Sequence, residues 1–278
     1  MNSKTINIKG LLLSLDEPQV MGILNVTPDS FYAGSRKETE AAIVDRIETI
    51  LDEGASMIDV GGYSSRPDAA EVSDTEEMRR LETALLQLQQ HYPHVVVSVD
   101  TFRSSVARQC VEKYGVAMIN DISGGELDER MFDTVAQLRV PYIMMHMRGT
   151  PQTMQQQTDY EDVTADLLKY FSQKLERLFR LGVNDVILDP GFGFSKTLAQ
   201  NYELMRHLDD FRIFGLPLLV GVSRKSMIYK LLGITSEESL NGSTVLHTYA
   251  LLHGADILRV HDVRAAREAI QIVQQLKG

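Results

Sequence analysis

The sequence predicts an α/β protein, a (β/α)8 TIM barrel preceded by a short N-terminal β-hairpin. Short apolar runs of strand length recur along the chain, and several are followed by stretches with helical periodicity. Strands that are apolar on both faces and joined by helices are parallel and buried, and about eight such units are typical of this barrel. No linker or low-complexity tract divides the sequence, so we expect one domain over residues 1–278.

The elements are expected in a regular order. Residues 5–15 alternate apolar and polar side chains around Lys9-Gly10, which predicts the hairpin. Strands are expected at residues 21–26, 57–62, 95–100, 117–121, 142–147, 186–191, 218–223 and 256–261. Helical periodicity is clear at residues 38–53, 74–91, 103–114 and 160–181, and a final helix closes the chain. The alternative is a doubly wound open sheet, which usually carries a glycine fingerprint where Gly22 stands alone.

Composition excludes several classes of protein. A net charge of -10 leaves no basic surface for nucleic acid or another polyanion. The single cysteine, Cys110, excludes an internal disulfide and a multi-cysteine zinc site. No apolar run reaches the ~18 residues of a membrane span, and residues 1–15 lack the pattern of a signal peptide. We expect a cytoplasmic protein that does not bind membranes.

Polar side chains follow the predicted strands where each strand ends. Pro28 cannot donate a hydrogen bond within a sheet, so the first strand stops near Val26 and leaves Asn25 at its carboxyl end. The residues at such ends are Asn25, Arg66, Asp100, Asn120, Asp189, Lys225, Arg259 and His261. Catalytic groups of these barrels lie at the carboxyl ends of the strands. We therefore expect the eight side chains at one rim.

Part of this set suits a flat heterocycle. Asp100, Asn120, Asp189 and Lys225 combine acceptors with donors, and a ring with amino and carbonyl groups offers the complementary partners. A buried carboxylate must be matched by donors, which a guanidine-like ring edge supplies in bidentate form. The alternative is a structural ion pair between Asp189 and Lys225.

The other part suits a pyrophosphate. Arg259 and His261 are two residues apart on one strand and so point the same way, and Arg66 lies in a Ser-Ser-Arg-Pro loop. Guanidinium groups bind phosphate oxygens as forked donors. Mg²⁺ accompanying the pyrophosphate would keep most of its waters, so Asn25 is expected as its only direct protein ligand.

Several residues also have a purely structural interpretation. Arg259 could form a salt bridge with Asp256 or Asp262 instead of binding an anion. His146 alternates away from its neighbours on the fifth strand, which predicts a buried histidine facing the helices. Cys110 is expected to be a small buried hydrophobe in the middle of a helix.

Seven short motifs together resemble dihydropteroate synthase. They are Asn25-Val-Thr-Pro-Asp-Ser30, Gly61-Gly-Tyr-Ser-Ser-Arg-Pro67, Ser98-Val-Asp-Thr101, Ile119-Asn-Asp121, Leu188-Asp-Pro-Gly-Phe-Gly-Phe194, Ser223-Arg-Lys-Ser226 and Arg259-Val-His-Asp262. The resemblance runs from about Val20 to the end of the chain in the same order. It implies a homodimeric (β/α)8 transferase of folate biosynthesis and a target of sulfonamides. Such an enzyme condenses 6-hydroxymethyl-7,8-dihydropterin pyrophosphate with 4-aminobenzoate and releases pyrophosphate with the help of Mg²⁺.

The resemblance also implies roles for individual residues. The pterin would be bound by Asp100, Asn120, Ile122, Met145, Asp189, Phe194, Gly221 and Lys225. The pyrophosphate would be bound by Asn25, Ser65, Arg66, Arg259 and His261, with Mg²⁺ on Asn25. The 4-aminobenzoate site would include Phe31, Pro67, Lys225 and Ser226. Arg66, Lys225, Arg259 and His261 are the expected catalytic residues.

The sequence departs from the family pattern in its first two loops. Tyr63 stands where Glu is usual, Ser65 stands where Thr is usual, and Ala33 replaces an Asp. Serine keeps the hydroxyl, whereas Ala33 removes a carboxylate that would orient Arg66. A non-catalytic pterin-binding protein is therefore one alternative. The others are a methyltransferase of the related barrel class that carries methyltetrahydrofolate, and a Schiff-base aldolase using Lys225.

Overall fold

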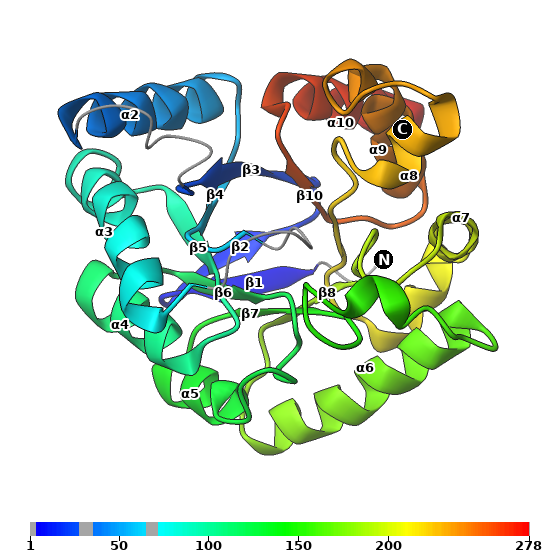
Figure 1. The fold of residues 1–278 in the computed structure, drawn as a ribbon, viewed down its shortest axis with the longest axis horizontal. Helices are drawn as coiled ribbons and strands as arrows, with labels where there is room; N and C mark the ends of the chain where they lie inside the picture. Colours follow the sequence, from blue (N-terminus) through cyan, green and yellow to red (C-terminus); the bar gives the residue numbers. More distant parts are fainter. Residues whose placement is uncertain (1–3, 28–35, 65–71, 278) are drawn as a thin grey trace.

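The computed structural model describes residues 4–27, 36–64 and 72–277. Eight parallel strands lie in the order β8-β7-β6-β5-β4-β3-β10-β9, and a parallel bridge between Leu188 and Leu218 joins the two ends of the sheet (Figure 1). The strands are β3 (Gln19–Asn25), β4 (Met57–Gly61), β5 (Val96–Asp100), β6 (Met118–Asp121), β7 (Tyr142–Met145), β8 (Val186–Asp189), β9 (Leu219–Val220) and β10 (Ile257–Val260). The predicted barrel is confirmed.

Helices surround the strands (Figure 1). They are α2 (Arg36–Asp52), α3 (Asp74–His91), α4 (Ser104–Tyr114), α5 (Met131–Leu138), α6 (Val163–Arg180), α7 (Leu198–Arg206), α8 (Ser226–Leu232), α9 (Leu240–Leu252) and α10 (Val263–Lys277). Three short 3-10 helices lie at Met154–Gln156, Leu208–Phe214 and Glu237–Ser239. Helices α5, α7, α8 and α9 were not among those predicted individually from the sequence. Within the described ranges, no helix has the length and apolar character needed to cross a membrane.

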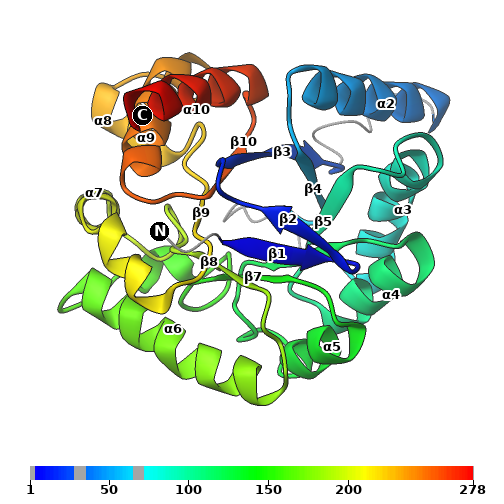
Figure 2. The same ribbon diagram turned by 180° about the vertical axis from the view of Figure 1, so that it is seen from behind.

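The predicted hairpin is present and covers the amino-terminal end of the barrel. Strands β1 (Thr5–Ile8) and β2 (Leu11–Ser14) pair antiparallel and lie across the barrel strands (Figure 2). Ile6 and Leu15 are buried in one cluster with the lowest inward-facing side chains of the barrel, such as Met57 and Ile187. Apolar burial of this kind contributes about 25 cal/mol per Å². The hairpin therefore forms the floor of the barrel.

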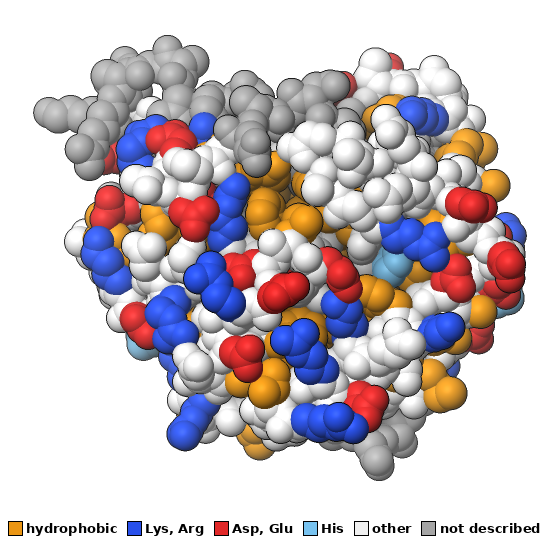
Figure 3. Space-filling model, turned by 60° about the horizontal axis from the view of Figure 1, so that its bottom comes forward, with side chains coloured by type: hydrophobic (Ala, Val, Ile, Leu, Met, Phe, Trp, Pro, Cys, Tyr) orange, Lys and Arg blue, Asp and Glu red, His pale blue; other side chains and the backbone are white. Residues whose placement is uncertain are grey.

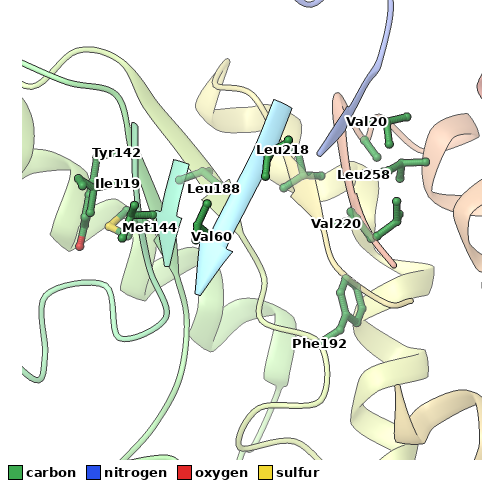
Figure 4. Close-up of a cluster of buried hydrophobic side chains, with 14 of the residues drawn as sticks. Val20, Val60, Ile119, Tyr142, Met144, Leu188, Phe192, Leu218, Val220 and Leu258 are labelled. Carbon is green, nitrogen blue, oxygen red and sulfur yellow. The ribbon is translucent and has the colours of Figure 1, made fainter. Parts of the chain in front are cut away.

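A second apolar layer lies between the strands and the helices. Outward-facing side chains such as Val60, Leu188 and Leu258 belong to this layer (Figure 4). Because side chains alternate along a strand, Asp59 and Gly61 on either side of Val60 face the barrel interior. Gly22 on β3 is required here, because a Cβ would come 2.5 Å from Ile50 Cγ2 on α2.

The surface carries charges of both signs. On the face shown in Figure 3, Lys and Arg side chains are interspersed with Asp and Glu side chains. No continuous basic patch is visible among the described residues of this face.

Candidate active site

A cavity of about 950 Å³ opens at the carboxyl ends of the barrel strands. It contains twelve of the residues expected at the site: Asn25, Asp100, Asn120, Ile122, Met145, Asp189, Phe194, Gly221, Lys225, Ser226, Arg259 and His261. The alternation of side chains along each strand brings them to one place, because β3 pairs with both β4 and β10 and the other strands follow in order. Phe31, Ser65, Arg66 and Pro67 lie outside the described residues.

Two carboxylates and an ammonium group lie in the part of the cavity expected to bind a ring. Burial raises the pKa of Asp189, against the charge of Lys225, and its Oδ1 accepts a hydrogen bond of 2.8 Å from the Gly191 N–H. Burial also raises the pKa of Asp100 to about 7, although the neighbouring Arg259 opposes the shift. These carboxylates lie where a ligand with N–H donors would complete their hydrogen bonds.

Lys225 makes no direct ion pair with Asp189 in the described part of the chain. Its Nζ donates to the Phe192 carbonyl oxygen at 2.6 Å and lies 4.7 Å from the centroid of the Phe194 ring. Burial lowers the pKa of Lys225 to about 8. The lysine is thus held at the cavity wall, half-buried, with hydrogen atoms left to donate.

Arg259 bonds to two carboxylates, and neither is one suggested by the sequence. Its Nε donates to Asp59 Oδ2 at 2.7 Å and its Nη2 donates to Asp100 Oδ2 at 2.8 Å. The suggested partners have other contacts: Asp256 pairs with Lys4, and Asp262 pairs with Arg224. The guanidinium therefore lies between the two halves of the cavity, and its Nη1 donates to none of the described residues.

His261 lies two residues beyond Arg259 at the rim. Its backbone N–H donates to Ser223 Oγ at 3.2 Å, and its Nδ1 lies 3.3 Å from the same oxygen. Desolvation, together with the positive charge of Arg259, lowers the pKa of His261 to about 4. The residue remains exposed, so solvent screens part of this shift. Both effects favour the neutral imidazole in the ligand-free protein.

Asn25 is the expected ligand for Mg²⁺, and its surroundings fit a metal that keeps its waters. A Cβ at Gly61 would come 3.2 Å from Asn25 Oδ1, so the missing side chain leaves room beside this oxygen. Among the described residues, no group of three or more His, Cys, Asp or Glu side chains is arranged to hold a metal ion. A single carboxamide suits a hydrated Mg²⁺ whose remaining ligands come from a substrate phosphate.

Asp59 was not among the residues expected from the sequence. Those residues follow the ends of the strands, whereas Asp59 lies two residues before the end of β4 and is fully buried. A lone carboxylate in the otherwise apolar run Met57-Ile-Asp-Val60 was the available signal. Asp59 does not itself line the cavity, whereas other residues not expected from the sequence do: Thr27, Tyr63, Ser64, Met154, Gln155, Phe192 and Ser223.

Tyr63, which departs from the family pattern, joins two loops at the mouth of the cavity. Its hydroxyl accepts a hydrogen bond of 3.0 Å from Gln152 Nε2, and its ring packs edge-on against Phe102 with centroids 5.2 Å apart. The guanidinium of Arg103 lies 5.4 Å from the centroid of the same ring. An aromatic ring therefore lines the cavity at the position where the resemblance implies a carboxylate.

His146 lies behind the cavity, as expected from its position on the fifth predicted strand. It is buried, and its Nδ1 lies 3.1 Å from Nζ of Lys196, which also donates to the carbonyl oxygens of Gly191 and Phe194. Burial lowers the pKa of both side chains well below their usual values. Lys196, which was not expected from the sequence, supports the loop that carries Phe194.

Comparisons with known proteins found a matching family and similar solved structures. The family described as pterin binding enzyme matches residues 21–261. The dihydropteroate synthase of Escherichia coli strain K12 is 42% identical over 268 residues, which cover 96% of this chain and 94% of that protein. The structure of Yersinia pestis dihydropteroate synthase with a sulfonamide drug complex has a TM-score of 0.89 at 40% identity and covers 98% of each chain. Xanthomonas albilineans dihydropteroate synthase with 4-aminobenzoic acid has a TM-score of 0.91 at 37% identity and covers 100% of this chain and 99% of that one.

Proposed function

This chain belongs to the dihydropteroate synthase family of transferases. We propose that its single barrel domain binds the ring and the pyrophosphate of its substrate in different parts of one cavity. The substrates are 6-hydroxymethyl-7,8-dihydropterin pyrophosphate and 4-aminobenzoate, and the products are 7,8-dihydropteroate and pyrophosphate. One observation carries the assignment. A single cavity joins Asp100, Asn120, Asp189 and Lys225, which suit a ring, to Arg259 and His261, which suit an anion.

The pterin ring would lie in the deeper part of the cavity. Asp189 and Asp100 would accept hydrogen bonds from its N–H groups, while Lys225 would donate to its carbonyl or ring nitrogen. Ile122, Met145 and Phe194 belong to one apolar cluster beside the cavity and would pack against the faces of the ring. Gly221 lines the cavity without a side chain and would leave space for the ring.

The pyrophosphate would lie toward the rim, between Arg259 and His261. Arg66 and Ser65 would add donors from the second loop, and the negative charge of the ligand would favour protonation of His261. Asn25 would hold Mg²⁺, which supplies positive charge to the leaving pyrophosphate when it is bound. These groups would stabilise the charge that develops on the pyrophosphate as the carbon–oxygen bond breaks.

The reaction would proceed by displacement at the pterin methylene carbon. The C–O bond to pyrophosphate breaks, the amine nitrogen of 4-aminobenzoate forms the new C–N bond, and this nitrogen passes a proton to water. The electron-rich dihydropterin can stabilise positive charge at the methylene, and the carboxylates of Asp100 and Asp189, which line the cavity, would favour it further. Phe31, Pro67, Lys225 and Ser226 would position the second substrate. Catalysis would rest on charge stabilisation and positioning, without a strong general base.

The direct test is a condensation assay. The purified protein is incubated with both substrates and Mg²⁺, and released pyrophosphate and dihydropteroate are measured together. Equal amounts of the two products are expected, and a sulfonamide that competes with 4-aminobenzoate should reduce both. Binding of dihydropterin without any product would favour a non-catalytic pterin-binding protein. Methyl transfer from methyltetrahydrofolate would favour the related methyltransferases.

We further propose that the protein is a cytoplasmic homodimer. The location stays a prediction from the sequence, whereas the dimer has support from apolar side chains exposed on two neighbouring helices. On α9 these are Val245 and Leu252, and on α10 they are Ile272 and Leu276. Light scattering after size-exclusion chromatography should give twice the chain mass of 31.2 kDa. Val245→Glu should shift the protein toward the monomer; a monomeric wild type would refute the dimer.

A further inference from the structure

Asp59 is a buried carboxylate that does not line the cavity. It lies on β4, faces the barrel interior, and its side chain is 0% exposed. Removing a carboxylate from water costs free energy unless donors compensate for the lost hydration. The contacts of Asp59 therefore indicate why the chain carries a charge at this depth.

One oxygen of Asp59 bonds to both halves of the site. Its Oδ2 accepts from Asn120 Nδ2 at 2.9 Å and from Arg259 Nε at 2.7 Å. Asn120 lies in the part expected to bind the ring, whereas Arg259 faces the part expected to bind the anion. The same guanidinium continues to Asp100 through Nη2. Asp59 is thus a shared acceptor between two cavity-lining side chains on different strands.

The contact also determines which way the Asn120 carboxamide points. An ionised carboxylate can only accept hydrogen bonds, so the Asn120 nitrogen must face Asp59. The carbonyl oxygen Oδ1 and the second N–H of the amide are then left for the cavity. An acceptor beside a donor is the complement of a ring edge in which an amino group neighbours an unprotonated ring nitrogen. A carboxamide turned the other way would lose its bond to Asp59.

We propose that Asp59 is a positioning residue that orients Asn120 to recognise the aminopyrimidine edge of the ligand and holds Arg259 against the pyrophosphate. The identity of the ligand rests on the proposed function. Asp59 contacts neither substrate and acts through the two side chains that it holds. The Oδ1 atom of Asp59 has no partner among the described residues, so its hydrogen-bonding role lies entirely with Oδ2.

The test compares Asp59→Asn with a matched control. Ser98→Ala removes a buried polar group that pairs in register with Asp59 on the next strand and whose hydroxyl has no partner among the described residues. Binding of 6-hydroxymethyl-7,8-dihydropterin is measured by calorimetry, alongside kcat and KM for each substrate. Asp59→Asn should weaken dihydropterin binding by roughly tenfold to hundredfold, the effect of losing a hydrogen bond to a charged group. Ser98→Ala should stay within about twofold of wild type.

A reciprocal exchange separates positioning from a merely structural role. Asp59→Asn/Asn120→Asp restores a hydrogen bond between the two positions but presents two acceptors to the cavity. Thermal stability should recover relative to Asp59→Asn, whereas dihydropterin binding should not. Recovery of both would refute the inference. Asp59→Ser is measured in parallel, in case the asparagine variant does not fold, and should weaken binding in the same direction.

The controls distinguish the inference from the proposed function. A wild-type protein that bound no dihydropterin would refute both together. A wild type that binds, beside an Asp59→Asn variant that binds equally well, would refute the inference alone.

Discussion

Replacement of Arg259 by methionine should damage stability and turnover together. The guanidinium donates to two carboxylates, Asp59 and Asp100, at 2.7 and 2.8 Å. Methionine keeps much of the side-chain volume but leaves both carboxylates without their cation. Breaking a buried ion pair from one side costs about 3–5 kcal/mol, because the remaining charge is uncompensated. Loss of the same cation from the leaving pyrophosphate should lower kcat by roughly 10²–10³.

The stability loss should depend on pH in a defined direction. The pKa of Asp100 is raised to about 7 by burial even with Arg259 present, and removing the cation raises it further. A carboxyl group with a raised pKa in the folded state binds more protons than in the unfolded state, so this group lowers stability as pH rises from about 4 toward the folded value. Arg259→Met should therefore be less destabilised at pH 5.5 than at pH 8.

Urea unfolding at the two pH values and a pyrophosphate-release assay measure these effects. Arg264→Met is the control, since Arg264 is exposed at the start of α10 and its loss should change stability by less than about 0.5 kcal/mol. The reasoning is wrong if Arg259→Met unfolds at the same urea concentration as wild type, or if it retains wild-type turnover.

Three further predictions follow from single features of the structure. The value of kcat/KM for dihydropterin pyrophosphate should fall below pH 7 as Asp100 gains a proton and above pH 8 as Lys225 loses one. Lys225→Arg should remove the fall at alkaline pH. A flat wild-type profile would contradict the roles of Asp100 and Lys225. Gly61→Ala should raise the Mg²⁺ concentration needed for half-maximal activity severalfold, because its Cβ would lie 3.2 Å from Asn25 Oδ1; an unchanged Mg²⁺ titration would argue against Asn25 as the ligand. Gly22→Ala should lower the free energy of unfolding by about 1–3 kcal/mol in urea titrations, because its Cβ meets α2 at 2.5 Å, and an unaltered midpoint would show that α2 moves freely.

Much of the fold follows from the period of the apolar residues. Strands such as β4 and β8 are buried on both faces, so their sequences are short apolar runs that stand out from the helices. Helices α5 and α7 were not singled out, because they have only 8 and 9 residues and span little more than two turns. A helix of this length contains too few residues for its apolar periodicity to be recognised in the sequence.

The candidate site was predictable wherever a polar residue ended a strand. Asp189 and His261 line the cavity for this reason. Pairings across the barrel were not predictable, because they depend on which inward-facing residues share a level. Arg259 therefore contacts Asp59, 200 positions away, and neither of the acidic residues near it in the sequence. Asp59 was not expected at the site, because a carboxylate within an apolar strand does not show which side chains it contacts.

The hairpin of β1 and β2 has a consequence for the order of events. Ile6 and Leu15 close the amino-terminal end of the barrel, whereas the cavity opens at the carboxyl ends of the strands. A molecule bound at the rim would obstruct the route to the interior. Dihydropterin pyrophosphate should therefore bind before 4-aminobenzoate. A sulfonamide should bind best to protein that already holds the pterin or the released pyrophosphate.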